Sequence, residues 1–243
     1  MHIPEFEYVE LTTPDGPMPA ALATPPIARG AIVVVQEAFG VTPHLENICK
    51  RLASAGWLAV APALYHREGS PVFAYDDFAS LMPVIQTLTS SGIETDLDFT
   101  FAYLHTRGFS MAQCGVVGFC MGGTVSMFAA TRAVLGAAVT FYGGGVAAGR
   151  FGFPALIDIA STLQTPWLGL YGDLDKGIPF DDVELLRAAA LTALVPTQVV
   201  RYADAEHGFN CDDRPSAYNA IAAADAWQRT LAWFDQFIPV AQT

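Results

Sequence analysis

The sequence predicts an α/β fold in which helices flank both faces of a mostly parallel sheet. Short apolar runs rich in Val, Ile, Leu and Ala alternate with helical stretches along most of the 243 residues, and buried parallel strands have this continuous apolar character. Hydrophobic residues make up 52% of the chain, which is enough for a sizeable core. No linker, charge block or repeat interrupts the pattern. We therefore expect a single domain over residues 1–243.

The individual elements are predicted from apolar periodicity and from the positions of glycine and proline. An antiparallel hairpin is expected at 6–12 and 18–24, and we place both of its strands at the edge of the sheet. Buried strands are expected at 30–37, 57–64, 113–119, 137–142, 167–171 and 197–202. Helices are expected at 43–55, 75–90, 94–107, 121–132, 180–193 and after Pro215.

The chain is strongly acidic, which bears on its partners and its location. It has 24 Asp and Glu against 12 Lys and Arg, and its net charge is −12. Such a surface repels polyanions, so we expect neither a nucleic-acid partner nor a membrane partner. The first ten residues contain neither a basic nor a long apolar stretch. We therefore expect a cytoplasmic protein without an export signal, whose four cysteines stay reduced.

A cysteine stands at the centre of a glycine-rich turn between a predicted strand and a predicted helix. The segment 118–122 reads Gly-Phe-Cys-Met-Gly, which is the nucleophile-elbow pattern G-x-S-x-G with Cys120 in place of serine. Glycines suit this turn because the residue between them has a strained backbone that crowds its neighbours. The same pattern alone also fits a phosphate-binding turn, or a cysteine that is only a small core residue.

An acid and a histidine follow later strands, in the order that nucleophile elbows require. Asp173 and Asp175 come after the strand at 167–171, and His207 comes after the strand at 197–202. The carboxyl ends of parallel strands share one edge of the sheet, and cysteine, acid, histidine is the order of the α/β-hydrolase triad. A thiol is mostly protonated at neutral pH, so a base must take its proton and a carboxylate must orient that base.

Two further features belong to the same predicted site. The N–H groups of Met121, after the nucleophile, and of Ala38, after the strand at 30–37, would form an oxyanion hole. Glu37 ends that strand, and from the residues alone it is either a catalytic carboxylate or one that caps a nearby helix N-terminus.

Four motifs together resemble the dienelactone hydrolases, also called carboxymethylenebutenolidases. They are Val-Gln-Glu-Ala-Phe-Gly at 35–40, Gly-Phe-Cys-Met-Gly-Gly at 118–123, the segment 171–179 from Tyr-Gly to Ile-Pro, and His-Gly-Phe at 207–209. The likeness runs from about residue 30 to the C-terminal helix. It implies an α/β-hydrolase fold and hydrolysis of small-molecule lactones or carboxylic esters through a thioester acyl-enzyme, with no cofactor and no metal.

The resemblance also assigns roles to residues. It implies a triad of Cys120, Asp175 and His207, with Asp175 preferred to Asp173 because of its spacing from Ile178-Pro179. Glu37 corresponds to the family's internal glutamate, which keeps the resting thiol protonated and accepts its proton when substrate displaces it.

The sequence departs from the family where substrate is bound. The dienelactone enzymes hold their substrate's carboxylate with two arginines, but here Cys211 stands at one of these places and no arginine lies between Arg67 and Arg107. Arg214 is the one nearby replacement. We therefore expect weak activity on anionic dienelactones and better turnover of neutral lactones or aryl esters. The pocket is expected to be lined by Phe39, Tyr65, His66, Phe73, Tyr142 and Phe209.

Other functions remain to be weighed against this one. The main alternative is a non-catalytic protein with a hydrolase fold that binds an apolar small ligand. A glutaminase would need glutamate two places after the histidine, where Phe209 stands. A metal hydrolase is disfavoured because the five histidines show no paired ligand spacing.

Overall fold

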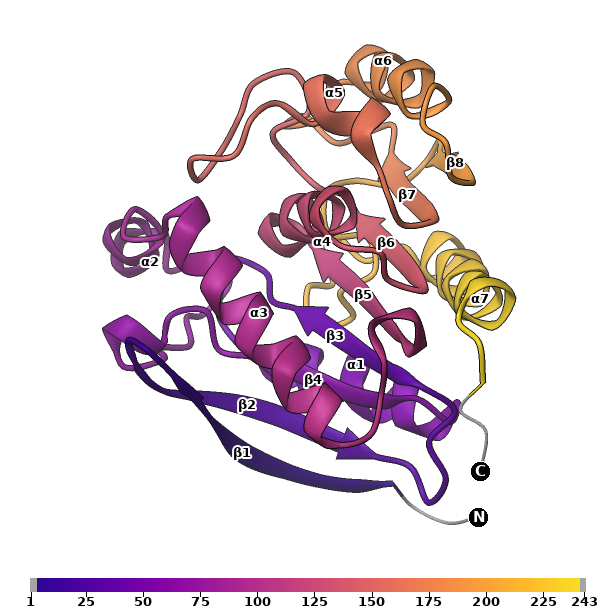
Figure 1. Cartoon of the computed structure of the whole chain (residues 1–243). Helices are drawn as coiled ribbons and strands as arrows, with labels where there is room; N and C mark the ends of the chain where they lie inside the picture. The colour runs from indigo at the N-terminus through magenta and orange to yellow at the C-terminus, as the bar shows by residue number, and fades with distance from the viewer. Residues whose placement is uncertain (1–3, 241–243) are drawn as a thin grey trace.

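The computed structural model describes residues 4–240, and its centre is one eight-stranded sheet with the strand order β1-β2-β4-β3-β5-β6-β7-β8 (Figure 1). The first three residues of the segment inspected for an export signal lie outside the described part. The strands are β1 (Glu5–Thr13), β2 (Gly16–Thr24), β3 (Ala31–Val35), β4 (Leu58–Pro62), β5 (Cys114–Phe119), β6 (Ala137–Phe141), β7 (Trp167–Gly172) and β8 (Thr197–Tyr202).

Helices cover both faces of this sheet, as the sequence predicts. The α-helices are α1 (Pro43–Ser54), α2 (Phe78–Ile85), α3 (Ser90–Thr106), α4 (Met121–Arg132), α5 (Leu156–Ile159), α6 (Phe180–Ala190) and α7 (Ala220–Phe237). Helices α1 and α7 pack on one face, and α3 and α4 pack on the other (Figure 1). The central strands are buried on both sides and form the core.

Strands β3 to β8 pair in parallel, whereas the N-terminal hairpin is antiparallel. The hairpin differs from the prediction in one respect, because β2 is not an edge strand. It pairs antiparallel with β4, from Ala20 opposite Pro62 to Ala23 opposite Ala59. The apolar residues at 20–23 are fully buried by this pairing, so β1 and β8 form the two edges.

The predicted helix at 75–90 is much shorter in the structure. Helix α2 begins after Asp77, whose side chain accepts a hydrogen bond from the Ser80 N–H, and it ends at Ile85, two residues after Pro83. A proline inside a helix removes one backbone hydrogen bond and crowds the preceding turn. A separate helix, α3, starts at the N-cap Thr89. Figure 1 shows α2 at the end of the sheet toward which β3 and β5 point.

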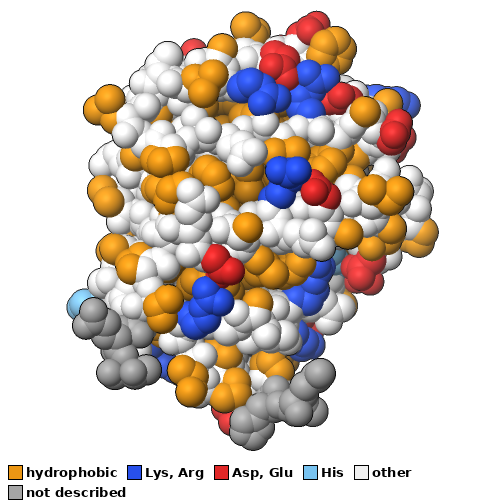
Figure 2. Space-filling model, turned by 90° about the vertical axis from the view of Figure 1, so that its right-hand side faces the viewer, with side chains coloured by type: hydrophobic (Ala, Val, Ile, Leu, Met, Phe, Trp, Pro, Cys, Tyr) orange, Lys and Arg blue, Asp and Glu red, His pale blue; other side chains and the backbone are white. Residues whose placement is uncertain are grey.

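The acidic excess is not gathered into one patch on the face that Figure 2 displays. There, Lys and Arg side chains lie beside Asp and Glu side chains, among scattered hydrophobic ones. Ion pairs of the described chain include Arg201 with Asp173 and Arg132 with Asp98. Within residues 4–240, no helix has the length and apolar character that crossing a membrane requires.

Candidate active site

A cavity of about 600 Å³ opens where the carboxyl ends of the central strands meet α2. Its lining includes Cys120, Asp175 and His207, together with Ala38 and Met121. Its size is ordinary for a small-molecule site. The structure thus brings together the predicted triad and the two predicted oxyanion residues, although they come from four separate loops.

Cys120 occupies the sharp turn between β5 and α4. Its φ of 54° and ψ of −112° are unusual for a residue with a side chain, and it is the N-cap of α4. The sulfur therefore stands at the N-terminal end of α4, where the helix dipole is positive. The other three cysteines are buried, whereas Cys120 is partly exposed.

Glycine is required on both sides of Cys120 because backbone passes very close. A Cβ on Gly118 would lie 1.8 Å from the Gly122 carbonyl oxygen, and a Cβ on Gly122 would lie 2.3 Å from the Val35 carbonyl oxygen. Neither neighbour can move aside, since both are backbone atoms of packed elements. The elbow glycines are therefore fixed by packing between β3, β5 and α4.

His207 contacts Asp175 beyond the carboxyl ends of β7 and β8. Its Nδ1 lies 2.6 Å from Asp175 Oδ2, while Asp175 Oδ1 accepts a hydrogen bond of 2.8 Å from the Gly177 N–H. Burial lowers the pKa of His207, but the negative charge of Cys120 and the hydrogen bond to Asp175 outweigh it and raise that pKa to about 10. The ring is therefore suited to carry a proton as an imidazolium.

Asp173, the other candidate acid, has a different partner. Its two carboxylate oxygens accept hydrogen bonds from Arg201 at 2.6 and 2.8 Å. Because both oxygens are engaged by this guanidinium, Asp173 is not the carboxylate that contacts His207.

Tyr65 links the two residues of the predicted oxyanion hole. Its hydroxyl donates to the Ala38 carbonyl oxygen at 2.7 Å and lies 3.8 Å from the Met121 sulfur. This contact holds the Ala38 carbonyl group in place near Met121, the residue after Cys120. The Met121 N–H is at the first turn of α4, where helix N–H groups have no intrahelical partner.

Glu37 lies behind the cavity rather than in its lining. Its side chain is 1% exposed, and neither carboxylate oxygen has a hydrogen-bond partner within residues 4–240. Burial raises its pKa, and this outweighs the opposing charges of His44, Arg214 and His207. A capping role for Glu37 is therefore not supported, since no helix N–H of the described chain contacts it.

None of the six aromatic and histidine side chains predicted to line the pocket does so. Tyr142 and Phe209 are fully buried behind His207, with ring centroids of Tyr142 and His207 5.1 Å apart. Phe39 packs edge-on against Tyr75, and Phe73 packs against Tyr65. These side chains therefore pack behind the wall of the cavity. A large apolar side chain fits a buried position behind the wall as well as it fits the wall itself.

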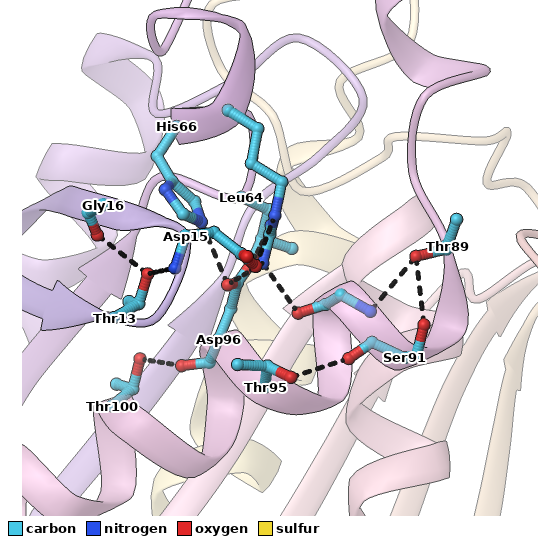
Figure 3. Close-up of polar contacts among 12 residues, drawn as sticks. Thr13, Asp15, Gly16, Leu64, His66, Thr89, Ser91, Thr95, Asp96 and Thr100 are labelled. Atoms are coloured by element: carbon cyan, nitrogen blue, oxygen red, sulfur yellow. Dashed lines mark hydrogen bonds and ion pairs between the residues drawn. The ribbon is translucent and has the colours of Figure 1, made fainter.

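His66 lies in a different part of the molecule, in a buried network that ties α3 to the segment after β4 (Figure 3). Its Nε2 is 3.0 Å from Asp96 Oδ1, and both side chains are almost completely buried. Arg67 donates to both Asp96 oxygens and also pairs with Asp15 in the β1–β2 turn. His66 is therefore a structural residue, and its predicted role in binding substrate does not hold.

The cavity wall contains residues that the sequence does not single out. Helix α2 contributes an apolar side, formed by Phe78, Leu81, Met82 and Ile85. The remaining wall brings in three cations, Arg150, Lys176 and Arg214. The lining thus contains two arginines, and the expectation that the family's carboxylate-binding pair is missing stays a prediction. Arg150 is in the loop after β6, which no motif marks, and its proximity to Cys120 depends on how that loop folds back.

Comparison with known proteins gives a consistent result. The model of the "Dienelactone hydrolase family" matches residues 18–238. The "Putative carboxymethylenebutenolidase" of Salmonella typhimurium is 41% identical over 229 residues, which cover 90% of this chain and 83% of that one. A crystal structure titled as a "Putative Dienelactone Hydrolase" from Klebsiella pneumoniae is 36% identical, with a TM-score of 0.89, and covers 97% of this chain and 100% of that one.

A more distant likeness concerns the fold alone. An acylaminoacyl peptidase from Pyrococcus horikoshii shares 14% identity and a TM-score of 0.74, and the match covers 43% of that chain.

The contacts around the elbow predict that Gly118→Ala destabilises the protein. The new Cβ would overlap the Gly122 carbonyl oxygen, and overpacking of this kind costs about 1–3 kcal/mol or more. Urea denaturation measures the loss. Gly177→Ala is the control, because its Cβ would meet only Asp175 Oδ1 at 3.4 Å; equal losses for both variants would show that the elbow is not sterically constrained.

The position of His66 predicts that His66→Asn lowers stability without changing catalysis. It removes one partner of the buried Asp96 but leaves Arg67 in place, so we expect a loss of about 1–3 kcal/mol. Thermal unfolding reports the loss, and kcat/KM for p-nitrophenyl acetate should stay the same. A lower kcat/KM at unchanged stability would show that His66 contributes to the substrate site.

Proposed function

Because this chain belongs to the dienelactone hydrolase family and is a hydrolase of ester or lactone bonds, we propose that it cleaves them through the thiolate of Cys120. The observation that carries the proposal is the 2.6 Å contact between His207 and Asp175 in the cavity that also holds Cys120. A strained nucleophile, a base and an orienting carboxylate in one cavity are what acyl transfer requires.

The first half-reaction forms a thioester. Glu37 accepts the proton of the Cys120 thiol, and the resulting thiolate attacks the carbonyl carbon of the substrate. The negative charge moves to the carbonyl oxygen, where the N–H groups of Ala38 and Met121 stabilise it. When the tetrahedral intermediate collapses, the bond to the alcohol oxygen breaks, and the His207 imidazolium gives that oxygen its proton.

The second half-reaction returns the enzyme to its resting state. His207, now neutral, takes a proton from water, and the hydroxide attacks the thioester carbon. Collapse of this intermediate breaks the carbon–sulfur bond and releases the acid. Cys120 leaves as a thiolate and regains its proton from Glu37, while the acid product loses one proton to solvent. Asp175 orients the ring throughout and stabilises its cationic form.

The cations in the wall favour an acyl group that carries a carboxylate. Arg150 and Arg214 line the cavity, and neither guanidinium has an ion-pair partner in the described part of the chain. Arg214 lies 5.3 Å from the Tyr75 ring and 5.7 Å from the Phe39 ring, and both aromatic faces hold it in place. We therefore reverse the expectation from sequence, and propose anionic lactones or esters as the preferred substrates.

The thiol mechanism predicts that Cys120→Ala lowers p-nitrophenyl acetate hydrolysis by about 10³-fold or more, since the whole covalent route is lost. Wild-type protein should also show a burst of p-nitrophenol equal to the concentration of enzyme. Cys114→Ala is the matched control, because this thiol is buried in β5. Equal rates for wild type and Cys120→Ala would favour the alternative of a non-catalytic protein that binds an apolar ligand.

The cationic wall predicts a charge-dependent effect of Arg214→Gln and Arg150→Gln. Each should lower kcat/KM for a dienelactone carboxylate by about 10-fold, as expected for loss of one charge-assisted hydrogen bond, and leave kcat/KM for its neutral methyl ester unchanged. Arg132→Gln is the control, because this residue pairs with Asp98 on the surface. Equal losses on both substrates would contradict a role in recognising the anion.

A further inference from the structure

A strained turn forms part of the cavity wall. Within residues 4–240, the residues other than glycine that have a positive φ are Ser70, Cys120, Tyr142 and Phe151. A bulky side chain in this backbone region is an outlier, and such outliers gather at functional sites. Cys120 is the nucleophile of the proposed mechanism, and the Tyr142 ring lies 5.1 Å from the His207 ring. Phe151 lines the same cavity, but the mechanism does not use it.

Phe151 occupies the first central position of a tight β-turn. The Phe153 N–H donates to the Arg150 carbonyl oxygen at 2.8 Å, and φ is 55° at Phe151 and 78° at Gly152. A hydrogen-bonded turn with positive φ at both central residues is of type I′. Gly, Asn and Asp dominate these positions, because larger side chains crowd the backbone there. Gly152 therefore suits its place in the turn, whereas Phe151 does not.

The turn is held from two sides. A Cβ on Gly152 would lie 3.1 Å from Ser90 Oγ, so the turn packs closely on the start of α3. The Phe153 ring, which follows the turn, packs 4.3 Å from the Phe128 ring of α4. Figure 1 shows the loop between β6 and α5 reaching toward α2. Phe151 is therefore held at a defined place beside the cavity.

Packing of the core does not explain why a phenylalanine stands at this position. Phe153 is 3% exposed and has its aromatic partner in α4. Phe151 is only partly buried, and no aromatic ring within residues 4–240 pairs with it. An asparagine would relax the turn and leave the core largely intact, so the ring is best explained by what it contacts in the cavity.

The surroundings of Phe151 suit a flat ring that bears a negative charge. The same turn begins with Arg150, which also lines the cavity and has no ion-pair partner in the described part of the chain. Helix α2 adds apolar side chains, including Phe78 and Met82. A cavity of about 600 Å³ admits a bicyclic aromatic group. Aromatic rings that pair gain affinity beyond the area that they bury.

We propose that Phe151 is a specificity-determining residue, which pairs with an aromatic ring of the substrate while Arg150 contacts a carboxylate on that ring. The preferred acyl group is then an aromatic carboxylate rather than an aliphatic one of the same charge. The inference rests on the proposed function, in which the cations of the wall recognise an anion. It adds the kind of group that carries the negative charge.

The experiment compares two carboxylates that share a carbon skeleton and a charge, 2-naphthoate and decahydro-2-naphthoate. Titration calorimetry measures their dissociation constants for the resting enzyme, so the reactivity of an ester does not enter. Wild-type protein should bind 2-naphthoate about 3- to 10-fold more tightly than its saturated counterpart, which is the range expected for one aromatic pair. Phe151→Leu keeps an apolar side chain in the turn and should abolish this preference.

Stability separates a role in binding from a role in packing. Phe151→Asn gives the turn the Asn-Gly pair that type I′ prefers, so we expect a melting temperature equal to or above that of wild type, with the aromatic preference lost. A side chain needed for packing would leave a void and lower the melting temperature. Phe99→Asn is the control, because Phe99 is 37% exposed on α3 and outside the cavity wall; both affinities should stay unchanged.

The outcomes distinguish the inference from the proposed function. If wild type binds both carboxylates equally, or if Phe151→Leu retains the preference, the role of Phe151 is overturned. A lower melting temperature of Phe151→Asn with equal losses of both affinities would also overturn it. If Arg150→Gln weakens the binding of neither carboxylate, the proposed recognition of anions fails at this residue and the inference fails with it. If the preference depends on Phe151 but hydrolysis does not depend on Cys120, the thiol mechanism fails and the inference stands.

Discussion

The geometry of the site depends on a steric constraint, the close approach of three backbone segments around Cys120. The carbonyl groups of Val35 and Gln36, at the end of β3, face the position where a Gly122 side chain would stand. The first turn of α4 can therefore pack directly on β3. This contact places Glu37 and Ala38 beside Cys120 and Met121, so the same glycines that permit the elbow also set the distance between Ala38 and Met121.

Two buried carboxylates next to this elbow differ in their hydrogen-bond partners. Asp175 has a backbone N–H on one oxygen and an imidazole on the other, so it is fixed in one orientation and one role. Glu37 has neither contact, and its pKa is raised by burial. The first carboxylate suits an orienting group, and the second suits a group whose proton must come and go.

The sequence predicted the fold and the family better than the lining of the pocket. The fold class, the family and most of the strands are confirmed, because buried strands and the four motifs are short-range patterns in the chain. The roles of Cys120, Asp175, His207 and Glu37 remain predictions, which the geometry supports. The lining of the pocket was predicted poorly, since a buried aromatic and a pocket aromatic such as Phe39 have the same local sequence. The position of Arg150 in the cavity wall depends on how the loop after β6 folds back, which no local sequence pattern encodes.

The residues around Cys120 and those that line the pocket differ in this way because the two parts of the site are attached differently to the core. The loops that carry Cys120 and Asp175 leave fully buried strands, whereas α2 is a short helix that contains Pro83 and buries only Leu81. Leu81 packs in a small cluster with Ala38 and Phe39 that is separate from the main core. An element with so little buried surface can change sequence and position at low cost. The α2 side of the cavity can therefore change while Cys120, which is held by backbone packing, stays fixed.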